Sequence, residues 1–201
     1  MKELKKQRIK TVLKYTWPIY IIVALLIGLG LNLIFGLTHR LPYYRTLTLF
    51  VSGEVIEQKK LEDDIVTKYK DNGLSMFSCI SAIPGESTYY QKLSVPGYNT
   101  ADVLLIPTSI LKDLNASAFA LEVNETLITS YYSNYNFYSQ ENIKYGIELD
   151  KSKVEQYFAL PNETIYMLLN AKSENMGEYG LNPDKSHNNA LNLVKEWGKH
   201  V

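Results

Sequence analysis

The sequence predicts an α/β fold in which an N-terminal transmembrane helix precedes a single lobe built on a mostly parallel sheet. Three observations support this prediction. Residues 17–37 form an apolar stretch without a charged side chain. From residue 46 onward, strand-like and helix-like segments alternate along the chain. One strand-like segment, residues 102–106, is a nearly continuous apolar run, which is typical of a strand buried on both faces of a sheet.

Charge is distributed unevenly along the 201 residues. The whole chain has 21 Lys and Arg against 21 Asp and Glu. Residues 1–16 contain five Lys and one Arg against one Glu, a net charge of +5, so the remaining residues carry −5. An acidic domain argues against nucleic acid as a partner, because phosphate contacts need clustered Lys and Arg. The length suffices for one anchor and one compact domain.

The apolar stretch 17–37 is long enough to cross a bilayer as a helix. At 1.5 Å per residue it covers about 30 Å, the thickness of the hydrocarbon core. Trp17 and Tyr20 lie at the edge where aromatic side chains prefer the membrane interface. The basic tail precedes the helix, so the positive-inside rule places the N-terminus in the cytoplasm and the following domain outside. We therefore predict a signal-anchor protein that crosses the cell membrane once.

The predicted organisation is a basic cytoplasmic tail, a transmembrane helix, a spacer and an extracellular α/β domain, at residues 1–16, 17–37, 38–44 and 45–201. A cleaved signal peptide is the alternative, but the apolar run is long for one and no Ala-x-Ala-like cleavage site follows it. The chain has one cysteine, Cys79, which cannot form an internal disulfide. A translocated domain without disulfides suits a bacterial cell surface better than a eukaryotic secretory compartment.

Small or polar residues recur at every fourth position of the apolar stretch, at Ala24, Gly28, Asn32 and Gly36. Residues with this spacing share one helix face. Such a face permits close packing of two membrane helices, and Asn32 can hydrogen-bond across it, so Gly28 and Asn32 are candidate interface residues. The alternative interpretation is compositional, because glycine and alanine are common in membrane helices.

The domain contains strands and helices in alternation. Strands are expected at residues 46–51, 74–83, 102–106, 145–149 and 164–170, and helices at 59–69, 87–93, 108–114 and 188–197. The helix at 59–69 places Leu61, Ile65 and Tyr69 at helical spacing, and Asn72-Gly73 follows it as a stop signal. A β-α-β-α-β order with buried strands predicts a parallel sheet with helices on its faces.

The loops after the first and third strands are candidate ligand sites. In open α/β sheets, ligands bind beyond the carboxyl ends of the strands. Ser52, Gly53 and Glu54 follow the first strand, and Thr108 and Ser109 follow the third. A helix that starts near Thr108 would direct free N–H groups toward an acceptor or anionic group. The simpler alternative is that these residues cap helices and form turns.

A tyrosine-rich segment, SYYSNYNFY, covers residues 130–138. Exposed aromatic side chains form carbohydrate platforms or protein interfaces, so Tyr131, Tyr132 and Tyr135 are candidate interface residues. The alternative is a connecting loop whose tyrosines pack against their own domain.

No catalytic or metal-binding motif is recognisable in the sequence. The three histidines are scattered, and the chain has no nucleophile elbow, Walker loop or dinucleotide fingerprint. Asp63 and Asp64 are adjacent, but adjacent helix residues point in different directions, which favours a solvated face over a catalytic pair. The residues therefore predict a protein that is not an enzyme and that uses no cofactor or metal.

The order of these segments resembles one lobe of the extracellular solute-binding proteins with the type II periplasmic-binding fold. The matching segments lie within about residues 45–125 and read TLTLFVSGEV, an amphipathic helix, LSMFSCISAI and ADVLLIPTSIL. Residues 143–200 would return into the same lobe. The resemblance implies a ligand edge lined by Ser52, Gly53, Glu54, Thr108 and Ser109.

The chain departs from this family in two respects. Residues 129–142 are too few to form the second lobe that normally closes over the ligand, and a membrane span replaces a lipid anchor. We expect a membrane-tethered binding domain for a small solute or for a membrane or envelope protein, such as a transporter component. The alternative is a structural or assembly protein that docks on another membrane protein through its outer domain and helix. The sequence leaves the ligand and the oligomeric state open.

Overall fold

The computed structural model describes residues 17–32, 42–181 and 187–201, and the chain divides into two units, Met1–Leu41 and Pro42–Val201. Residues 17–32 of the first unit form an α-helix without a charged side chain. The predicted span 17–37 extends beyond these residues, and Gly36 also lies outside the described part. Within residues 17–32, 42–181 and 187–201, no helix is both long enough and apolar enough to cross a membrane.

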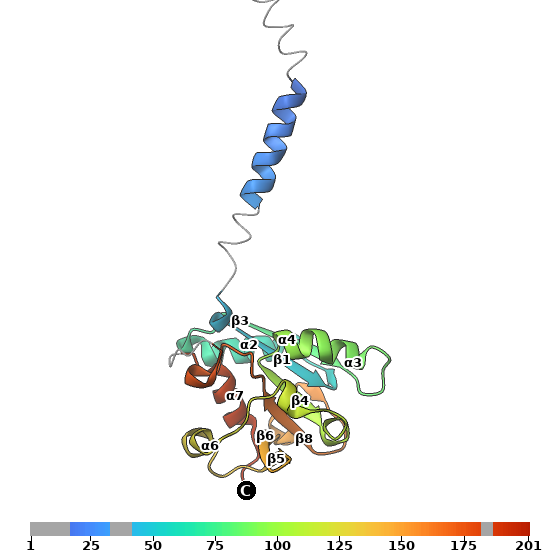
Figure 1. The fold of residues 1–201 in the computed structure, drawn as a ribbon, viewed down its shortest axis with the longest axis vertical. Helices are drawn as coiled ribbons and strands as arrows, with labels where there is room; N and C mark the ends of the chain where they lie inside the picture. Colours follow the sequence, from blue (N-terminus) through green and yellow to red (C-terminus); the bar gives the residue numbers. More distant parts are fainter. Residues whose placement is uncertain (1–16, 33–41, 182–186) are drawn as a thin grey trace, which may run out of the picture. The chain divides into compact units, whose positions relative to one another are not determined.

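The second unit contains eight strands in its described residues (Figure 1). They are β1 (Thr46–Ser52), β2 (Glu54–Val55), β3 (Met76–Ala82), β4 (Val103–Pro107), β5 (Phe137–Gln140), β6 (Ile143–Glu148), β7 (Phe158–Ala159) and β8 (Ile165–Leu169). The α-helices of this unit are α2 (Gln58–Tyr69), α3 (Tyr89–Lys92), α4 (Tyr98–Thr100), α5 (Thr108–Leu111), α6 (Glu125–Tyr131) and α7 (Asn189–Trp197). A π-helical turn, Leu93–Gly97, joins α3 to α4.

Six of the strands form one mixed sheet in the order β3-β1-β4-β8-β6-β5. Strands β3, β1 and β4 are parallel, whereas the β4–β8, β8–β6 and β6–β5 pairs are antiparallel. Four of the six strands, β3, β1, β4 and β6, therefore point the same way. The α/β class is confirmed. The parallel arrangement holds for the first half of the domain, and the second half returns into the same sheet by antiparallel pairing.

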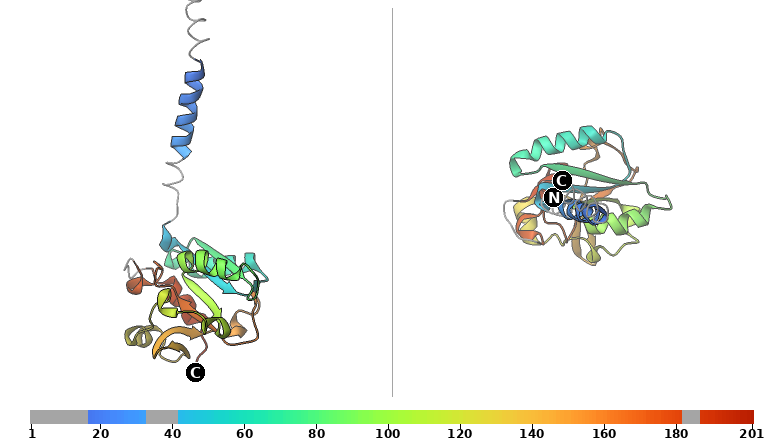
Figure 2. Two further views of the ribbon diagram at one scale, coloured as in Figure 1. Left: turned by 45° about the vertical axis from the view of Figure 1, so that its right-hand side comes forward. Right: turned by 90° about the horizontal axis from the view of Figure 1, so that it is seen from above.

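Alternating side chains of the strands enter two cores on opposite faces of the sheet. Leu47, Leu49 and Val51 of β1 pack with α2 and α7 on one face. Phe50 of the same strand packs with Tyr89 and with residues near α3 and α5 on the other. Figure 2, in the view from above, shows α2 and the α3–α4 segment on opposite sides of the strands. This two-layer covering explains why β4 is buried at every position.

Every predicted strand and helix is present with bounds within three residues of the predicted ones, but several short elements were not predicted. Helix α2 begins one residue before the predicted range. Strand β4 lies one residue later than predicted, and α7 begins one residue later. Strand β5, helix α6 and the two-stranded β2–β7 ribbon were not predicted. The β5–β6 hairpin turns through Glu141 and Asn142, which both have positive φ. Strand β4, which has only five residues, was identified by its apolar run, whereas these elements contain no such run.

Candidate functional site at the amino ends of the parallel strands

A cavity of about 440 Å³ lies at the amino ends of β1 and β4. Three segments line it: the start of β1, the turn that leads into β4, and the loop that follows β8. They meet there because β8 is antiparallel to β4, so the carboxyl end of β8 lies beside the amino end of β4. The volume falls within the range of small-molecule sites in proteins. This cavity is the candidate site.

Asp102 is the buried acid of this cavity, with 7% of its surface exposed. Its carboxylate joins the three segments. The Thr48 N–H donates to Oδ2 at 2.7 Å, and on Oδ1 the Ser173 hydroxyl and the Asn175 amide donate at 2.5 and 3.1 Å. The backbone N–H of Asp102 in turn donates to the Thr48 carbonyl at 2.7 Å. One carboxylate thus holds β1 and the loop after β8 to the start of β4.

Burial raises the pKa of Asp102 to about 6, and the nearby Glu174 carboxylate acts in the same direction. The hydrogen bonds from Ser173, Thr48 and Asn175 stabilise the charged form and oppose this shift. The carboxyl group is therefore ionised at neutral pH and becomes protonated in mildly acidic solution. Buried acids with a displaced pKa in a cavity are frequent at functional sites.

The rest of the lining combines donors and acceptors. Lys172 lies at the exposed rim and donates from Nζ to the Asn99 side-chain oxygen at 3.1 Å. Asn170 is buried and donates to the Ala101 carbonyl at 2.7 Å, which fixes the turn before β4. The Thr48 hydroxyl forms a 3.0 Å hydrogen bond with the Ser78 hydroxyl. Such a lining suits a small polar solute that both donates and accepts hydrogen bonds.

In the described part of the chain, no three His, Cys, Asp or Glu side chains converge where a metal ion could be held. Asp102 is surrounded by hydroxyl, amide and N–H donors, which are partners for an anion. The arrangement favours binding through hydrogen bonds.

The predicted ligand residues after β1 are used within the domain. Ser52 is fully buried, and its hydroxyl forms a 2.7 Å hydrogen bond with the Tyr89 hydroxyl. A Cβ atom at Gly53 would lie 2.7 Å from the Ala159 carbonyl oxygen, so β7 covers this residue closely. Glu54 is exposed and pairs through its backbone with Ala159 in the β2–β7 ribbon. This loop is therefore closed by packing, which the sequence did not reveal.

Thr108 and Ser109 also bond to their own chain. The Thr108 hydroxyl donates to the Thr164 carbonyl at 2.8 Å. The Ser109 N–H and hydroxyl donate to the two carboxylate oxygens of Glu163 at 2.8 and 2.7 Å. The acceptor predicted for the start of this helix is thus supplied by the protein itself.

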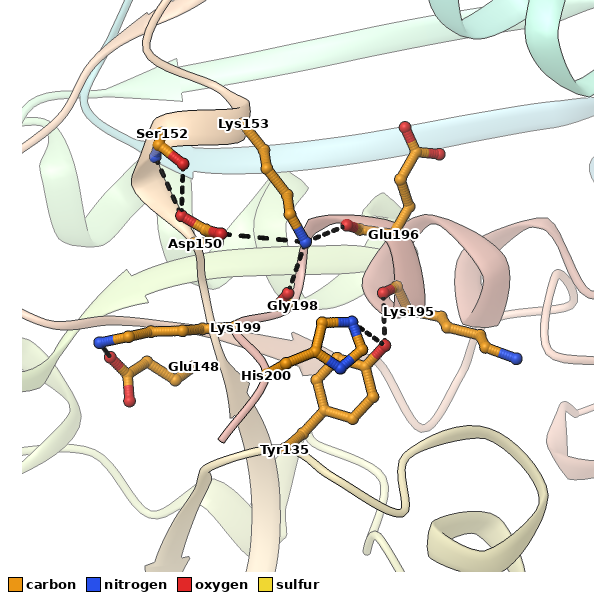
Figure 3. A network of polar contacts seen from close by, with 10 residues as sticks. All are labelled: Tyr135, Glu148, Asp150, Ser152, Lys153, Lys195, Glu196, Gly198, Lys199 and His200. Atoms are coloured by element: carbon orange, nitrogen blue, oxygen red, sulfur yellow. Dashed lines mark hydrogen bonds and ion pairs between the residues drawn. The ribbon is translucent and has the colours of Figure 1, made fainter.

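A second, more open hollow of about 340 Å³ adjoins Glu163 and Thr164 at the carboxyl ends of the strands. Its charged side chains are engaged with neighbours. Glu148 accepts from Lys199 Nζ at 2.8 Å, and Asp150 accepts from the Ser152 hydroxyl at 2.7 Å (Figure 3). This hollow is smaller, and none of the charged side chains that line it is buried, so the cavity at Asp102 is the better candidate.

The tyrosine-rich segment belongs to the core. Tyr132 is fully buried, and its hydroxyl donates to the Leu191 carbonyl in α7 at 3.0 Å. Tyr135 is 7% exposed and donates to the Lys195 carbonyl at 2.7 Å (Figure 3). Tyr131 is partly exposed and accepts from Asn188 at 3.2 Å. The structure therefore corrects the exposed interface predicted for Tyr132 and Tyr135, because helix α7 covers both rings.

The end of the chain is held against this same region (Figure 3). The Tyr135 hydroxyl lies 3.3 Å from Nε2 of His200, and Lys153 Nζ donates to the carbonyls of Glu196 and Gly198 at 2.8 Å each. The segment after α7 therefore lies against the tyrosine-rich segment and the end of β6. Gly28 and Asn32 lie in the helix at residues 17–32, and their role in helix packing stays a prediction.

The sequence did not indicate Asp102, because it was included in an apolar strand. An acid next to the run Val103–Pro107 was the available signal, as was the polar stretch 170–175 after the last strand. Comparisons with protein-family models, with curated proteins and with solved structures find no match to this chain. The cavity is therefore interpreted from its geometry alone.

Proposed function

We propose that this chain is a membrane-tethered binding domain that takes a small polar solute in the cavity at Asp102. The observation that carries the proposal is a cavity of about 440 Å³ at which three segments of the sheet converge on one buried carboxylate. A ligand hydroxyl or amine bound there would meet Asp102 as an acceptor, with Lys172 at the rim as a donor. The mode of action is binding without covalent chemistry.

The proposed tether is supported by the helix at residues 17–32. Its large apolar side chains are exposed, from 46% at Val23 to 64% at Tyr20. A helix that is apolar all round is unusual in water and typical of a lipid environment. With residues 33–37 added, the stretch reaches the length of a bilayer span, and the basic residues before it favour a cytoplasmic N-terminus. We accordingly propose that the domain from Pro42 faces the cell exterior.

The proposed kinship with one lobe of a solute-binding protein is supported by topology. The first three sheet strands and the helices between them follow the expected β-α-β-α-β order. Strands β6 and β8 then return into the same sheet, as expected for a lobe that stands alone. The proposed ligand position differs from the expected one, because it lies at the opposite ends of the strands.

Isothermal titration of the full-length chain in detergent, against a library of small polar solutes, tests the binding function. We expect at least one solute to bind, and the substitution Asp102→Asn to weaken its affinity at least tenfold. Glu54→Gln, at the opposite ends of the strands, serves as the control and should leave the affinity unchanged. Absence of binding across the library, or equal binding by the Asp102→Asn variant, would contradict the proposal.

Extraction of cell membranes with alkaline carbonate tests the tether separately. The full-length chain is expected to stay in the membrane pellet. Two charges introduced in the helix, as Leu25→Arg and Leu29→Arg, should move the chain to the supernatant, whereas the matched apolar changes Leu25→Ile and Leu29→Ile should not. Release of the unchanged chain by carbonate would refute the tether and leave the binding proposal standing.

A further inference from the structure

The two edges of the six-stranded sheet differ in how they are protected. An edge strand presents unpaired N–H and C=O groups to other chains, and proteins blunt such edges with short strands, bulges or charged side chains. Strand β5 has four residues and a register shift between Tyr138 and Ser139. Strand β3 has seven residues, without a charge, a proline or a register shift. Only the β3 edge is left open to pairing by these criteria.

The register with β1 identifies the backbone groups of β3 that face outward. The Ser75 N–H donates to the Arg45 carbonyl at 2.8 Å, so Ser75 faces β1. Because successive residues of a strand alternate in the direction of their backbone groups, Phe77, Cys79 and Ser81 also face β1. Those of Met76, Ser78 and Ile80 therefore point away from it, whereas Ala82 at the end of the strand pairs with Gly53, whose N–H donates to the Ala82 carbonyl at 3.0 Å. No strand within the described ranges pairs with that side of β3.

This outward set is symmetric about Ser78 and therefore matches a second copy of itself. In an antiparallel pair of β3 strands, Ser78 lies opposite its own equivalent and Met76 opposite Ile80 of the other copy, so all three outward residues form hydrogen-bonded pairs. Met76 is 48% exposed and Ile80 is partly exposed. Both side chains lie on the same face of the strand, so the pairing buries two apolar contacts.

Charges near the two ends of β3 fit the same arrangement. Arg45 lies beside the amino end and Glu54 beside the carboxyl end, where Gly53 bridges to Ala82. Lys70 and Asp71 precede the strand, and Glu86 follows it. Antiparallel pairing brings Arg45 and Lys70 of one copy toward Glu54 and Glu86 of the other. Asp71 at the amino end and Lys92 at the carboxyl end, where its Nζ donates to the Ser81 carbonyl at 3.2 Å, partly offset this attraction.

We infer that β3 is a dimerisation edge at which a second copy of this chain pairs antiparallel, joining the two six-stranded sheets into one. The contact is isologous, with its two-fold axis at Ser78. It uses main-chain hydrogen bonds of Met76, Ser78 and Ile80 and the apolar pairs of Met76 with Ile80. None of these three residues lines the solute cavity, but Ser78 bonds to Thr48 of its lining.

Disulfide trapping of the full-length chain in detergent tests this arrangement. Cys79→Ser removes the native thiol, and Ser78→Cys then places one cysteine on the proposed axis. Opposed residues of a hydrogen-bonded pair have Cα atoms about 5.5 Å apart, which suits a disulfide. Mild oxidation should convert most of this variant to a covalent dimer. Ser139→Cys, at the exposed position of the protected edge β5, is the matched control and should remain monomeric.

A further change sharpens the test. Met76→Lys, at an exposed position, should lower the yield of the Ser78→Cys dimer at least fivefold, because it places a charge at the paired edge. Since Ser78 bonds to Thr48, circular dichroism must confirm that the cysteine variant is folded. If it is not folded, a mixture of Met76→Cys and Ile80→Cys chains, both in the Cys79→Ser background, should give a crosslinked pair. Absence of crosslinks in the folded variants, or equal crosslinking of Ser139→Cys, would overturn the inference.

Discussion

The amino and carboxyl ends of the parallel strands β1 and β4 use their polar side chains differently. At the amino ends, the Asp102 carboxylate gathers donors from two other segments and a cavity of about 440 Å³ stays open beside it. At the carboxyl ends, Ser52 bonds to Tyr89 and Ser109 bonds to Glu163. Beyond β1, Gly53 is covered by β7. The comparison shows that a candidate ligand site forms where the fold leaves a cavity beside its polar groups, and not wherever polar residues follow a strand.

The largest expected effect follows from removing the acid at the amino ends. Asp102→Ala should lower the free energy of unfolding by about 3 kcal/mol, because two buried side-chain donors and the partly buried Thr48 N–H lose their acceptor. Urea denaturation of the full-length chain measures this. Glu174→Ala, at the rim of the same cavity, should change stability by no more than about 0.5 kcal/mol. Equal effects of the two changes would show that Asp102 does not hold the segments together.

A methyl group at the covered glycine tests the closed end. Gly53→Ala should cost about 2 kcal/mol, because its Cβ would lie 2.7 Å from the Ala159 carbonyl and 3.0 Å from Leu160 Cδ2. The neighbouring change Glu54→Ala affects an exposed side chain and should be close to neutral. The same denaturation experiment compares the two. A neutral Gly53→Ala would mean that the carboxyl ends are more open than the structure shows.

The pKa of Asp102 gives the next effect. Its folded pKa of about 6 exceeds the ordinary value of 3.8, so between these values the folded chain binds a proton that the unfolded chain lacks. The contribution of this group to stability therefore rises as pH falls, by about 1 kcal/mol from pH 7 to pH 5. Asp102→Asn resembles the protonated form and removes this contribution. The stability difference between the two chains should change across this pH interval, and a constant difference would contradict the pKa shift.

The smallest effect is expected for the exposed bonds at Ser109. A double-mutant cycle of Ser109→Ala and Glu163→Ala should give a coupling energy of about 0.5–1 kcal/mol, because solvent competes for these hydrogen bonds. A coupling energy near zero would show that Glu163 does not occupy the start of α5 in solution.

The class of fold was predictable because long local patterns specify it. The spacing of Leu61, Ile65 and Tyr69 identified α2, and those three residues are its buried positions. The apolar run after Asp102 identified β4, which the structure buries completely. Such elements are identified by a stripe or run of side chains that faces one core, so neighbouring sequence is sufficient.

The candidate site was not predictable in the same way. It depends on β8 running antiparallel to β4, which brings Asn170, Ser173 and Asn175 beside Asp102 from about seventy residues away. The sequence contains no local sign of that pairing. The ligand residues predicted after β1 and β4 contact other parts of the domain for a related reason. Tyr89, Ala159 and Glu163 reach them from distant segments.

Binding affinity in a matched pair of surface variants tests the central claim most directly. For a solute found by titration, Lys172→Ala at the amino-end cavity and Ser109→Ala at the carboxyl ends each remove one exposed polar side chain. We predict that Lys172→Ala weakens binding at least fivefold and that Ser109→Ala leaves it unchanged. The opposite result, with Ser109→Ala as the weaker binder, would place the solute at the carboxyl ends and contradict the account.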